Sequence, residues 1–311
     1  MRDWPTPYVL RGQPSVGVAR VGLGLTVYLA DAVTWASEAA ALLLRDFLRV
    51  APRQELLWYT TSRLTVWNRV VSDDLDQLVE VLSTPWTQRR VRHCFSFRLA
   101  NDTGAPDAGF WYHEVDPTRA GVAGFVQIVL PIDSPPDDLL QLATAVGHSA
   151  PVWSFVGGHL ATFHPHTRPT AFWCIHAWCR RYLGLDVQDP EQGGQRAASG
   201  LLGSSWLTFL GHPLVKALDL DVEALGAPPW KGGVEATQLL GGTLLKAGAA
   251  PVLGDLNRQQ YPTAYARVAR RLAPLYVAEP PRFQGRFRVE DDVQAWMHRF
   301  VATREWAGTA W

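Results

Sequence analysis

The densest group of side chains able to do chemistry lies in one segment of the second half of the chain. It contains His159, His164, His166, Cys174, His176 and Cys179. Zinc sites use four nitrogen or sulfur ligands in a tetrahedron, so these residues are candidate ligands. Cys174 and Cys179, however, are separated by about 140° around a helix of 3.6 residues per turn and therefore lie on different faces. This spacing fits no zinc module, and we predict no metal site and no cofactor.

The motifs that mark the common enzyme classes are absent from the sequence. It has no GxxxxGK[ST] phosphate loop, no GxSxG nucleophile elbow and no HExxH zinc helix. Gly22-Leu23-Gly24 lacks the third glycine of a dinucleotide-binding loop. We therefore predict no catalytic residues. An enzyme of hydrolase type that uses the histidine-rich second half is the alternative.

Tryptophan is unusually common, with 14 residues in a chain of 311. Most should be buried, but exposed tryptophans often carry the binding energy of protein–protein interfaces. Trp86 follows a proline in a break between a predicted helix and a predicted strand, where a large side chain is often exposed. Trp111 and Tyr112 point to opposite sides of one strand, so at most one of them should contact a partner. We predict these three aromatics as partner-binding candidates.

The acidic residues form two groups, each at the start of a predicted helix. They are Asp73, Asp74, Asp76 and Glu80 in the first group, and Asp133, Asp137 and Asp138 in the second. The helix dipole favours carboxylates at these positions, which is a sufficient structural explanation. Asp133 and Asp137 also lie near the end of a strand meander, where we predict that they present charge to a basic partner. A basic group that includes Arg98 is interpreted as a solvated edge strand.

The composition excludes several classes of protein. The 29 basic and 29 acidic residues cancel, so the basic excess of a nucleic-acid-binding protein is missing. Three cysteines are too few, and odd in number, for a disulfide framework, which fits a reducing compartment. The first 15 residues lack the apolar segment of a signal peptide, and no uncharged apolar run of ~18 residues predicts a membrane span. We expect a cytoplasmic protein that contacts neither nucleic acid nor membrane directly.

Hydrophobic patterns in the first half predict an α+β fold with mixed or antiparallel sheets and packed helices. We expect strands over 21–30 and 56–61, and helices over 31–50 and 72–82. Short loops rich in Gly, Asp and Pro separate the next strand-like runs, which are 92–100, 109–115 and 125–132. These runs predict an antiparallel meander. A helix then opens at Ser134-Pro135-Pro136.

The second half shows a similar mixture. We expect a polar loop over 188–203, strands over 152–163, 206–210, 235–240 and 243–247, and helices over 170–183, 262–275 and 291–300. Helix 262–275 places Tyr265, Val268, Ala269 and Leu272 on its buried face and turns Arg267, Arg270 and Arg271 outward. We predict two α+β halves, residues 1–150 and 151–311, which are either related subdomains or parts of one compact domain.

The most specific resemblance to a known family lies in residues 240–275, LGGTLLKAGAAPVLGDLNRQQYPTAYARVARRLAPL. This segment resembles the C-terminal signature of the type VI secretion immunity family. Other segments agree with the family in order, namely Leu57-Trp58-Tyr59-Thr60, Gly184-Leu185-Asp186-Val187 and Ser205-Trp206-Leu207-Thr208-Phe209-Leu210-Gly211. The resemblance also covers 29–52 and is weakest over 1–20 and 115–149. Where an acidic pair is expected after the Trp206–Gly211 strand, this chain has His212-Pro213.

The resemblance implies a bacterial immunity protein that binds and neutralises a cognate effector toxin by blocking its active site. Some members of the family accompany nuclease toxins, so a nuclease is one expected partner. The matching motifs are turn glycines, strand cores and a C-terminal helix, and they imply no catalytic residue. An adaptor that loads an effector onto the secretion machine is a further alternative. The sequence leaves the oligomeric state open.

Overall fold

The protein is described by a computed structural model. It covers residues 4–10, 13–31, 38–62, 64, 66–71, 74–83, 95–114, 121–163, 167–221, 230, 232–288 and 290–308. Trp86, His164 and His166, which figured in the sequence predictions, lie outside the described residues.

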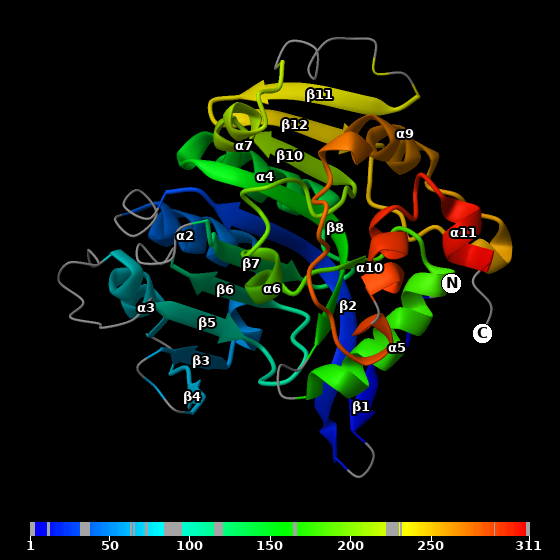
Figure 1. The fold of residues 1–311 in the computed structure, drawn as a ribbon. Helices are drawn as coiled ribbons and strands as arrows, with labels where there is room; N and C mark the ends of the chain where they lie inside the picture. The colour runs from blue at the N-terminus through cyan, green and yellow to red at the C-terminus, as the bar shows by residue number, and fades with distance from the viewer. Residues whose placement is uncertain are drawn as a thin grey trace.

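One large sheet forms the centre of the protein (Figure 1). Its strands follow the order β11-β12-β10-β8-β2-β7-β6-β5-β3-β4, with β1 beside β2 and β9 beside β8. Every strand pairing described is antiparallel apart from that of β8 with β9. The strands are β1 Tyr8–Leu10, β2 Gln13–Leu29, β3 Trp58–Thr61, β4 Asn68–Arg69, β5 Ser96–Ala100, β6 Gly109–His113, β7 Gly124–Leu130, β8 Val152–Phe163, β9 Asp186–Val187, β10 Leu207–Gly211, β11 Val234–Leu239 and β12 Gly242–Ala247.

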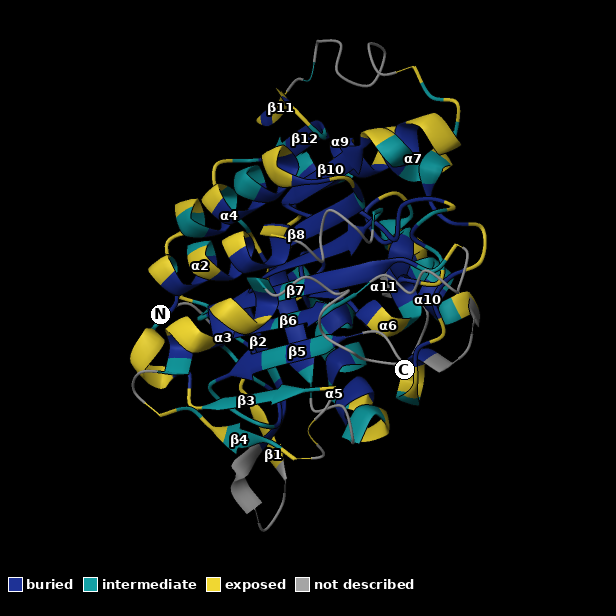
Figure 2. Ribbon diagram, turned by 90° about the vertical axis from the view of Figure 1, so that its left-hand side faces the viewer, coloured by how far each residue is buried: buried dark blue, intermediate teal, exposed yellow. Residues whose placement is uncertain are grey.

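Helices cover both faces of this sheet, which gives three layers (Figures 1 and 2). Helices α2, α3 and α4 lie on one face, and α5, α6, α10 and α11 lie on the other. The helices are α2 Ala40–Val50, α3 Asp74–Ser83, α4 Pro136–Ser149, α5 Arg168–Arg181, α6 Pro190–Gly193, α7 His212–Ala217, α9 Thr263–Leu272, α10 Glu290–Met297 and α11 Thr303–Gly308. Short 3-10 helices are η2 Arg53–Glu55, η5 Leu256–Arg258, η6 Ala273–Leu275 and η7 Gly285–Arg288. None of the described helices is long and apolar enough to cross a membrane.

Strand β2 is the centre of the sheet and pairs with β7 on one side and β8 on the other. Its pairing with β8 runs from Ala19 opposite Phe163 to Leu29 opposite Val152. A strand covered on both faces is apolar almost throughout, which explains the hydrophobic run that predicted it. Gly24 is a glycine because a Cβ atom there would meet the Leu160 side chain at 2.4 Å. The glycine pair in this strand therefore serves sheet packing.

The α+β class and the antiparallel meander predicted from the sequence are both confirmed, the meander as β5, β6 and β7. The apolar stripe of α9 is also confirmed, because Tyr265, Val268, Ala269 and Leu272 are buried. Because β2 pairs with β8, one sheet runs through residues 1–150 and 151–311. Their division into two domains stays a prediction.

Candidate interaction surface around Trp111

Successive side chains of β5, β6 and β7 point to opposite faces of the sheet. One set therefore contacts α2, and the other set faces the layer of α5 and α6. Phe110 contacts Phe47 of α2, with ring centroids 5.8 Å apart, so Phe110 and Tyr112 point toward the α2 side. The neighbouring positions point to the other face. There, Arg98 pairs with Trp111 and Trp111 with Gln127, which forms one row across β5, β6 and β7.

This row is the centre of the candidate surface. The Arg98 guanidinium carbon lies 3.6 Å from the centroid of the Trp111 ring. Phe125 meets the same ring edge-on, with centroids 4.7 Å apart. The indole nitrogen of Trp111 donates a hydrogen bond to the Ser96 hydroxyl at 3.4 Å. A partly buried tryptophan is thus held from three sides, which reduces the entropy that it would lose on binding a partner.

An ion-pair network joins this row to α5 and α6. Glu191 of α6 lies 3.6 Å from Arg98 and 2.7 Å from Arg168, and Arg168 lies 3.4 Å from Asp189. Burial lowers the pKa of Arg98 to about 10, although Glu191 opposes this shift. Burial also lowers the pKa of Arg168, but Asp189 and Glu191 outweigh it, and the net shift is upward. Both arginines are therefore cations at neutral pH.

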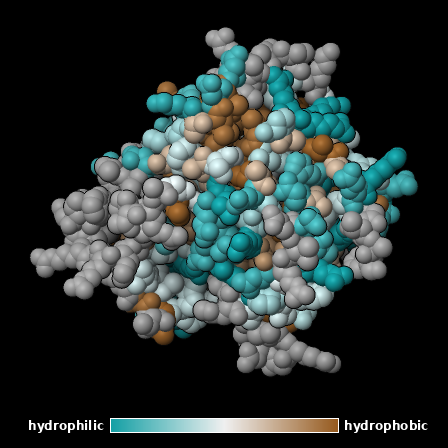
Figure 3. All heavy atoms as spheres, in the orientation of Figure 1, coloured by the Kyte–Doolittle hydropathy of each residue, from teal (hydrophilic) through white to brown (hydrophobic). Residues whose placement is uncertain are grey.

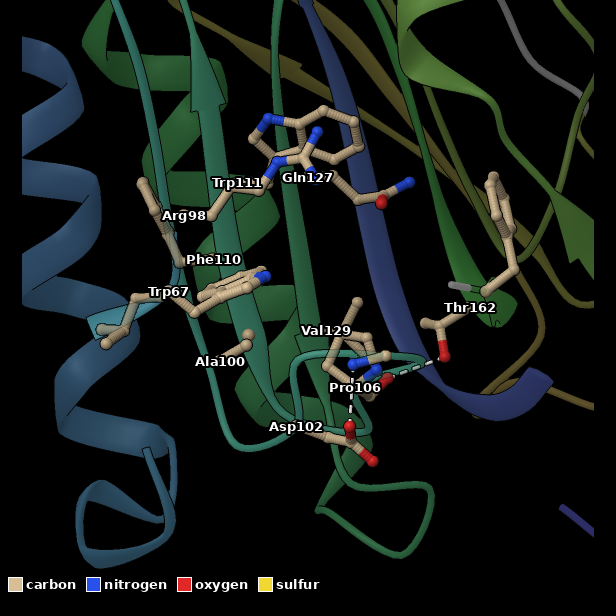
Figure 4. Close-up of a pocket in the computed structure, with 14 residues that line it drawn as sticks. Trp67, Arg98, Ala100, Asp102, Pro106, Phe110, Trp111, Gln127, Val129 and Thr162 are labelled. Atoms are coloured by element: carbon tan, nitrogen blue, oxygen red, sulfur yellow. Dashed lines mark hydrogen bonds between the residues drawn. The ribbon is translucent and has the colours of Figure 1, made fainter. Parts of the chain in front are cut away.

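A pocket opens beside this row, with a cavity volume of about 60 Å³. Figure 4 shows Trp67, Trp111 and Gln127 around it, which come from the residue before β4, from β6 and from β7. Val129 and Pro106 complete its apolar wall. Figure 3 looks onto this face and shows small hydrophobic patches among hydrophilic atoms, one of them beside β4. Leu64 and Val66, which precede β4 in the sequence, are exposed.

The structure separates the residues predicted to bind a partner. Trp111 belongs to this surface, whereas Tyr112 is fully buried on the α2 side, so its prediction as an exposed anchor is wrong. Asp133 and Asp137 are exposed and lie elsewhere, around the start of α4. Asp133 lines a different cleft, of about 730 Å³, together with Trp4 and His159. Trp86 lies outside the described residues.

The histidines and cysteines do not converge on a site in the part of the chain that the structure describes. No group of three or more potential metal ligands occurs there. Cys179 is fully buried, and burial raises the pKa of the Cys174 thiol to about 11, so neither is a ready nucleophile. His176 packs between the rings of Phe287 and Trp306. These contacts are those of structural residues.

Sequence reasoning missed three residues that build the candidate surface, namely Arg98, Gln127 and Glu191. Arg98 was interpreted as part of a solvated edge strand, but β5 is paired on both sides, with β3 and β6. The signal that could have found it is its position between Phe97 and Leu99, two buried residues, which marks a charged side chain on the opposite face of an inner strand. Glu191 reaches the site only through tertiary contact.

Comparison with known proteins identifies a matching family and a solved structure of similar fold. A family model described as type VI immunity for VRR-NUC matches residues 96–300, well over half of the chain. The structure is similar to that of a Pseudomonas aeruginosa T6SS protein, PA0821, with a TM-score of 0.75 and 18% sequence identity over 94% of this chain and 88% of that one. At this identity the likeness shows a shared fold. No curated protein matches the chain significantly in sequence.

Proposed function

This chain belongs to the family of type VI immunity proteins for VRR-NUC, and we propose that it binds a cognate nuclease toxin and covers the toxin's active site. The match over residues 96–300 is the observation that carries this proposal. The matched segment begins at β5 and includes the whole Arg98–Trp111–Gln127 row. We propose further that the protein acts in the cytoplasm, where a nuclease toxin would meet its substrate, and that it has no enzymatic activity of its own.

Inhibition by binding requires a tight complex and no catalytic group. A nanomolar complex needs about 12 kcal/mol of binding free energy, and interfaces of this kind bury roughly 800 Å² on each partner. Arginine and tryptophan are the residue types most often found at the energetic centre of such interfaces. The stacked pair of Arg98 and Trp111 supports a binding role because it is already fixed in the unbound chain.

The acids at the start of α4 fit the edge of an interface with a nuclease. Proteins that bind nucleic acid carry basic surfaces that neutralise phosphates. Asp133 and Asp137 are exposed and make no ion pair within the described part of the chain. We assign them the role of attracting the basic toxin surface, which would increase the association rate more than the final affinity.

Titration of the purified toxin's nuclease activity with this protein tests the proposal. Stoichiometric inhibition is expected, with activity falling linearly to zero at a fixed molar ratio and with full recovery when the toxin is released by denaturation and refolding. Substoichiometric and permanent loss of activity would indicate an enzyme that modifies the toxin. Binding without inhibition would indicate an adaptor. Either result would reject the proposed function.

A further inference from the structure

The pocket beside Trp111 is shaped for an apolar group. Its walls are formed by Trp67, Trp111 and Val129, together with the backbone of β5 and β6. The cavity volume of about 60 Å³ exceeds the ~10–15 Å³ that a single water needs, so a group of several heavy atoms can enter. Figure 4 shows that the pocket is bounded by side chains from separate strands, so its shape depends on the folded sheet.

The charges around the pocket are already matched within the chain. Arg20 lies 2.9 Å from Asp102, Arg98 lies 3.6 Å from Glu191, and Arg168 lies 3.4 Å from Asp189. A phosphate or a carboxylate entering here would compete with these carboxylates for the arginines. A lysine or arginine would enter an apolar pocket whose nearby acids are already paired, at a large desolvation cost. The charge pattern therefore selects an uncharged occupant.

One polar atom at the pocket has an unused hydrogen-bonding capacity. The Gln127 amide nitrogen donates to the Thr26 hydroxyl at 3.1 Å. The amide oxygen of Gln127 accepts no hydrogen bond within the described residues, and it lies on a side chain that lines the pocket. An occupant that combines an apolar body with a hydrogen-bond donor would satisfy both the walls and this acceptor.

We propose that the pocket receives a tyrosine or tryptophan side chain of the toxin, whose hydroxyl or indole N–H donates to the Gln127 amide oxygen. The inference rests on the proposed function and specifies where and how the toxin is held. Tyrosine and tryptophan are the two side chains that offer a large apolar ring with one donor, and both are enriched at binding hot spots. Trp111, held by Arg98 and Phe125, forms the fixed wall against which the incoming ring packs.

Two variants of this chain test the pocket by calorimetric titration with a catalytically inactive form of the toxin. Ala100→Leu fills the pocket, because Ala100 is a buried lining residue. It should weaken binding by about 30-fold or more, the fold-change of a hot-spot loss. Gln127→Met keeps the side-chain volume but removes the acceptor, and should weaken binding about 5-fold. Trp173→Ala is the matched control, since Trp173 also stacks with an arginine, Arg286 at 5.3 Å, but does not line the pocket.

A double-mutant cycle identifies the occupant. Each tyrosine and tryptophan of the toxin is replaced by alanine and titrated against the parent chain and Ala100→Leu. One replacement should weaken binding to the parent strongly and binding to Ala100→Leu little, because both changes remove the same contact. If the change in binding free energy caused by every toxin replacement simply adds to that caused by Ala100→Leu, the inference is wrong.

Other outcomes separate the inference from the proposed function. If the parent chain fails to bind the toxin, the proposed function itself is rejected. If the parent binds and both pocket variants bind equally well, only the inference is rejected. A similar loss in Trp173→Ala would show that the effect is not specific to the pocket. A homodimer of the free chain that Ala100→Leu dissociates would make a second copy the occupant and would also overturn the inference. Thermal melts identify any variant that does not fold, and the Gln127 variant and the toxin replacements then decide.

Discussion

The Arg98 guanidinium carbon lies 3.6 Å from the centroid of the Trp111 ring, and Glu191 lies 3.6 Å from the same guanidinium group. The arginine is thus fixed by an aromatic face from β6 and by a carboxylate from α6, two elements far apart in the sequence. A planar guanidinium can satisfy both contacts at once, whereas an ammonium group cannot stack in the same way. Arg98 is therefore a positioning residue for Trp111.

Replacing Arg98 by lysine tests this role. The charge is kept, but the stacked contact, which is worth about 0.5–1 kcal/mol at a partly exposed site, is lost. We expect Arg98→Lys to speed dissociation of the toxin complex by a factor of about 2–5, with little change in the association rate. Because the stacked contact lies within the free chain, the melting temperature should also fall, by no more than about 4 °C. Surface plasmon resonance separates the two rates. A slower association at unchanged dissociation would contradict a positioning role and would indicate long-range electrostatics.

Replacing Asp133 and Asp137 together by asparagine should have the opposite kinetic signature. These exposed acids can attract a basic toxin surface, so their loss should slow association and leave dissociation nearly unchanged. The difference from the parent should shrink as salt is added, because the Debye length falls to about 3 Å at 1 M. Stopped-flow mixing at several salt concentrations measures this. If association rates stay equal at low salt, these acids do not face the toxin.

Helix α9 offers a test of the packing. Leu272 is fully buried, so Leu272→Ala should lower the free energy of unfolding by about 2–5 kcal/mol. Arg270 is exposed on the opposite side, and Arg270→Ala should change it by no more than about 0.5 kcal/mol. Denaturant titration measures both. Arg267 and Arg271 are less suitable controls than the sequence implied, because Arg267 donates to the Gly232 carbonyl and Arg271 stacks over Trp230.

His176 should make stability depend on pH. Burial lowers its pKa from 6.5 to about 4, with Asp292 opposing the shift and Arg180 and Arg286 adding to it. Between these two pH values the unfolded chain binds a proton at His176 that the folded chain does not, so stability falls as the pH falls through this window. We expect a lower melting temperature at pH 5 than at pH 7.5, and a smaller difference in His176→Phe. If the melting temperature depends on pH equally in the parent and in His176→Phe, other groups cause the acid sensitivity.

Removal of metal ions should have no effect on this protein. The prediction comes from the spacing of the cysteines, and Cys174 and Cys179 are placed as packing residues in α5. After dialysis against a chelator, the melting temperature and the toxin affinity should match those of untreated protein. Elemental analysis provides the second measurement. Stoichiometric zinc whose loss abolishes binding would show that the histidine-rich segment forms a site after all.

Local patterns in the sequence were sufficient for much of the secondary structure. The predicted strand over 152–163 coincides with β8, and the meander and the buried stripe of α9 were predicted correctly. These features depend on side-chain periodicity, which neighbouring residues express directly. Sequence patterns did not predict the short helices α6 and α7, because four to six residues are too few to show a helical period.

The interaction surface could be predicted from the sequence only in part. Alternation along β6 determined that Trp111 and Tyr112 lie on opposite faces, because successive side chains of any strand do so. It could not determine which face α2 would cover, and that choice buries Tyr112 and leaves Trp111 at the pocket. Arg98, Gln127 and Glu191 meet there because strand register and the placement of α6 bring three distant segments together. Those contacts depend on the path of the whole chain, so only the tertiary structure decided them.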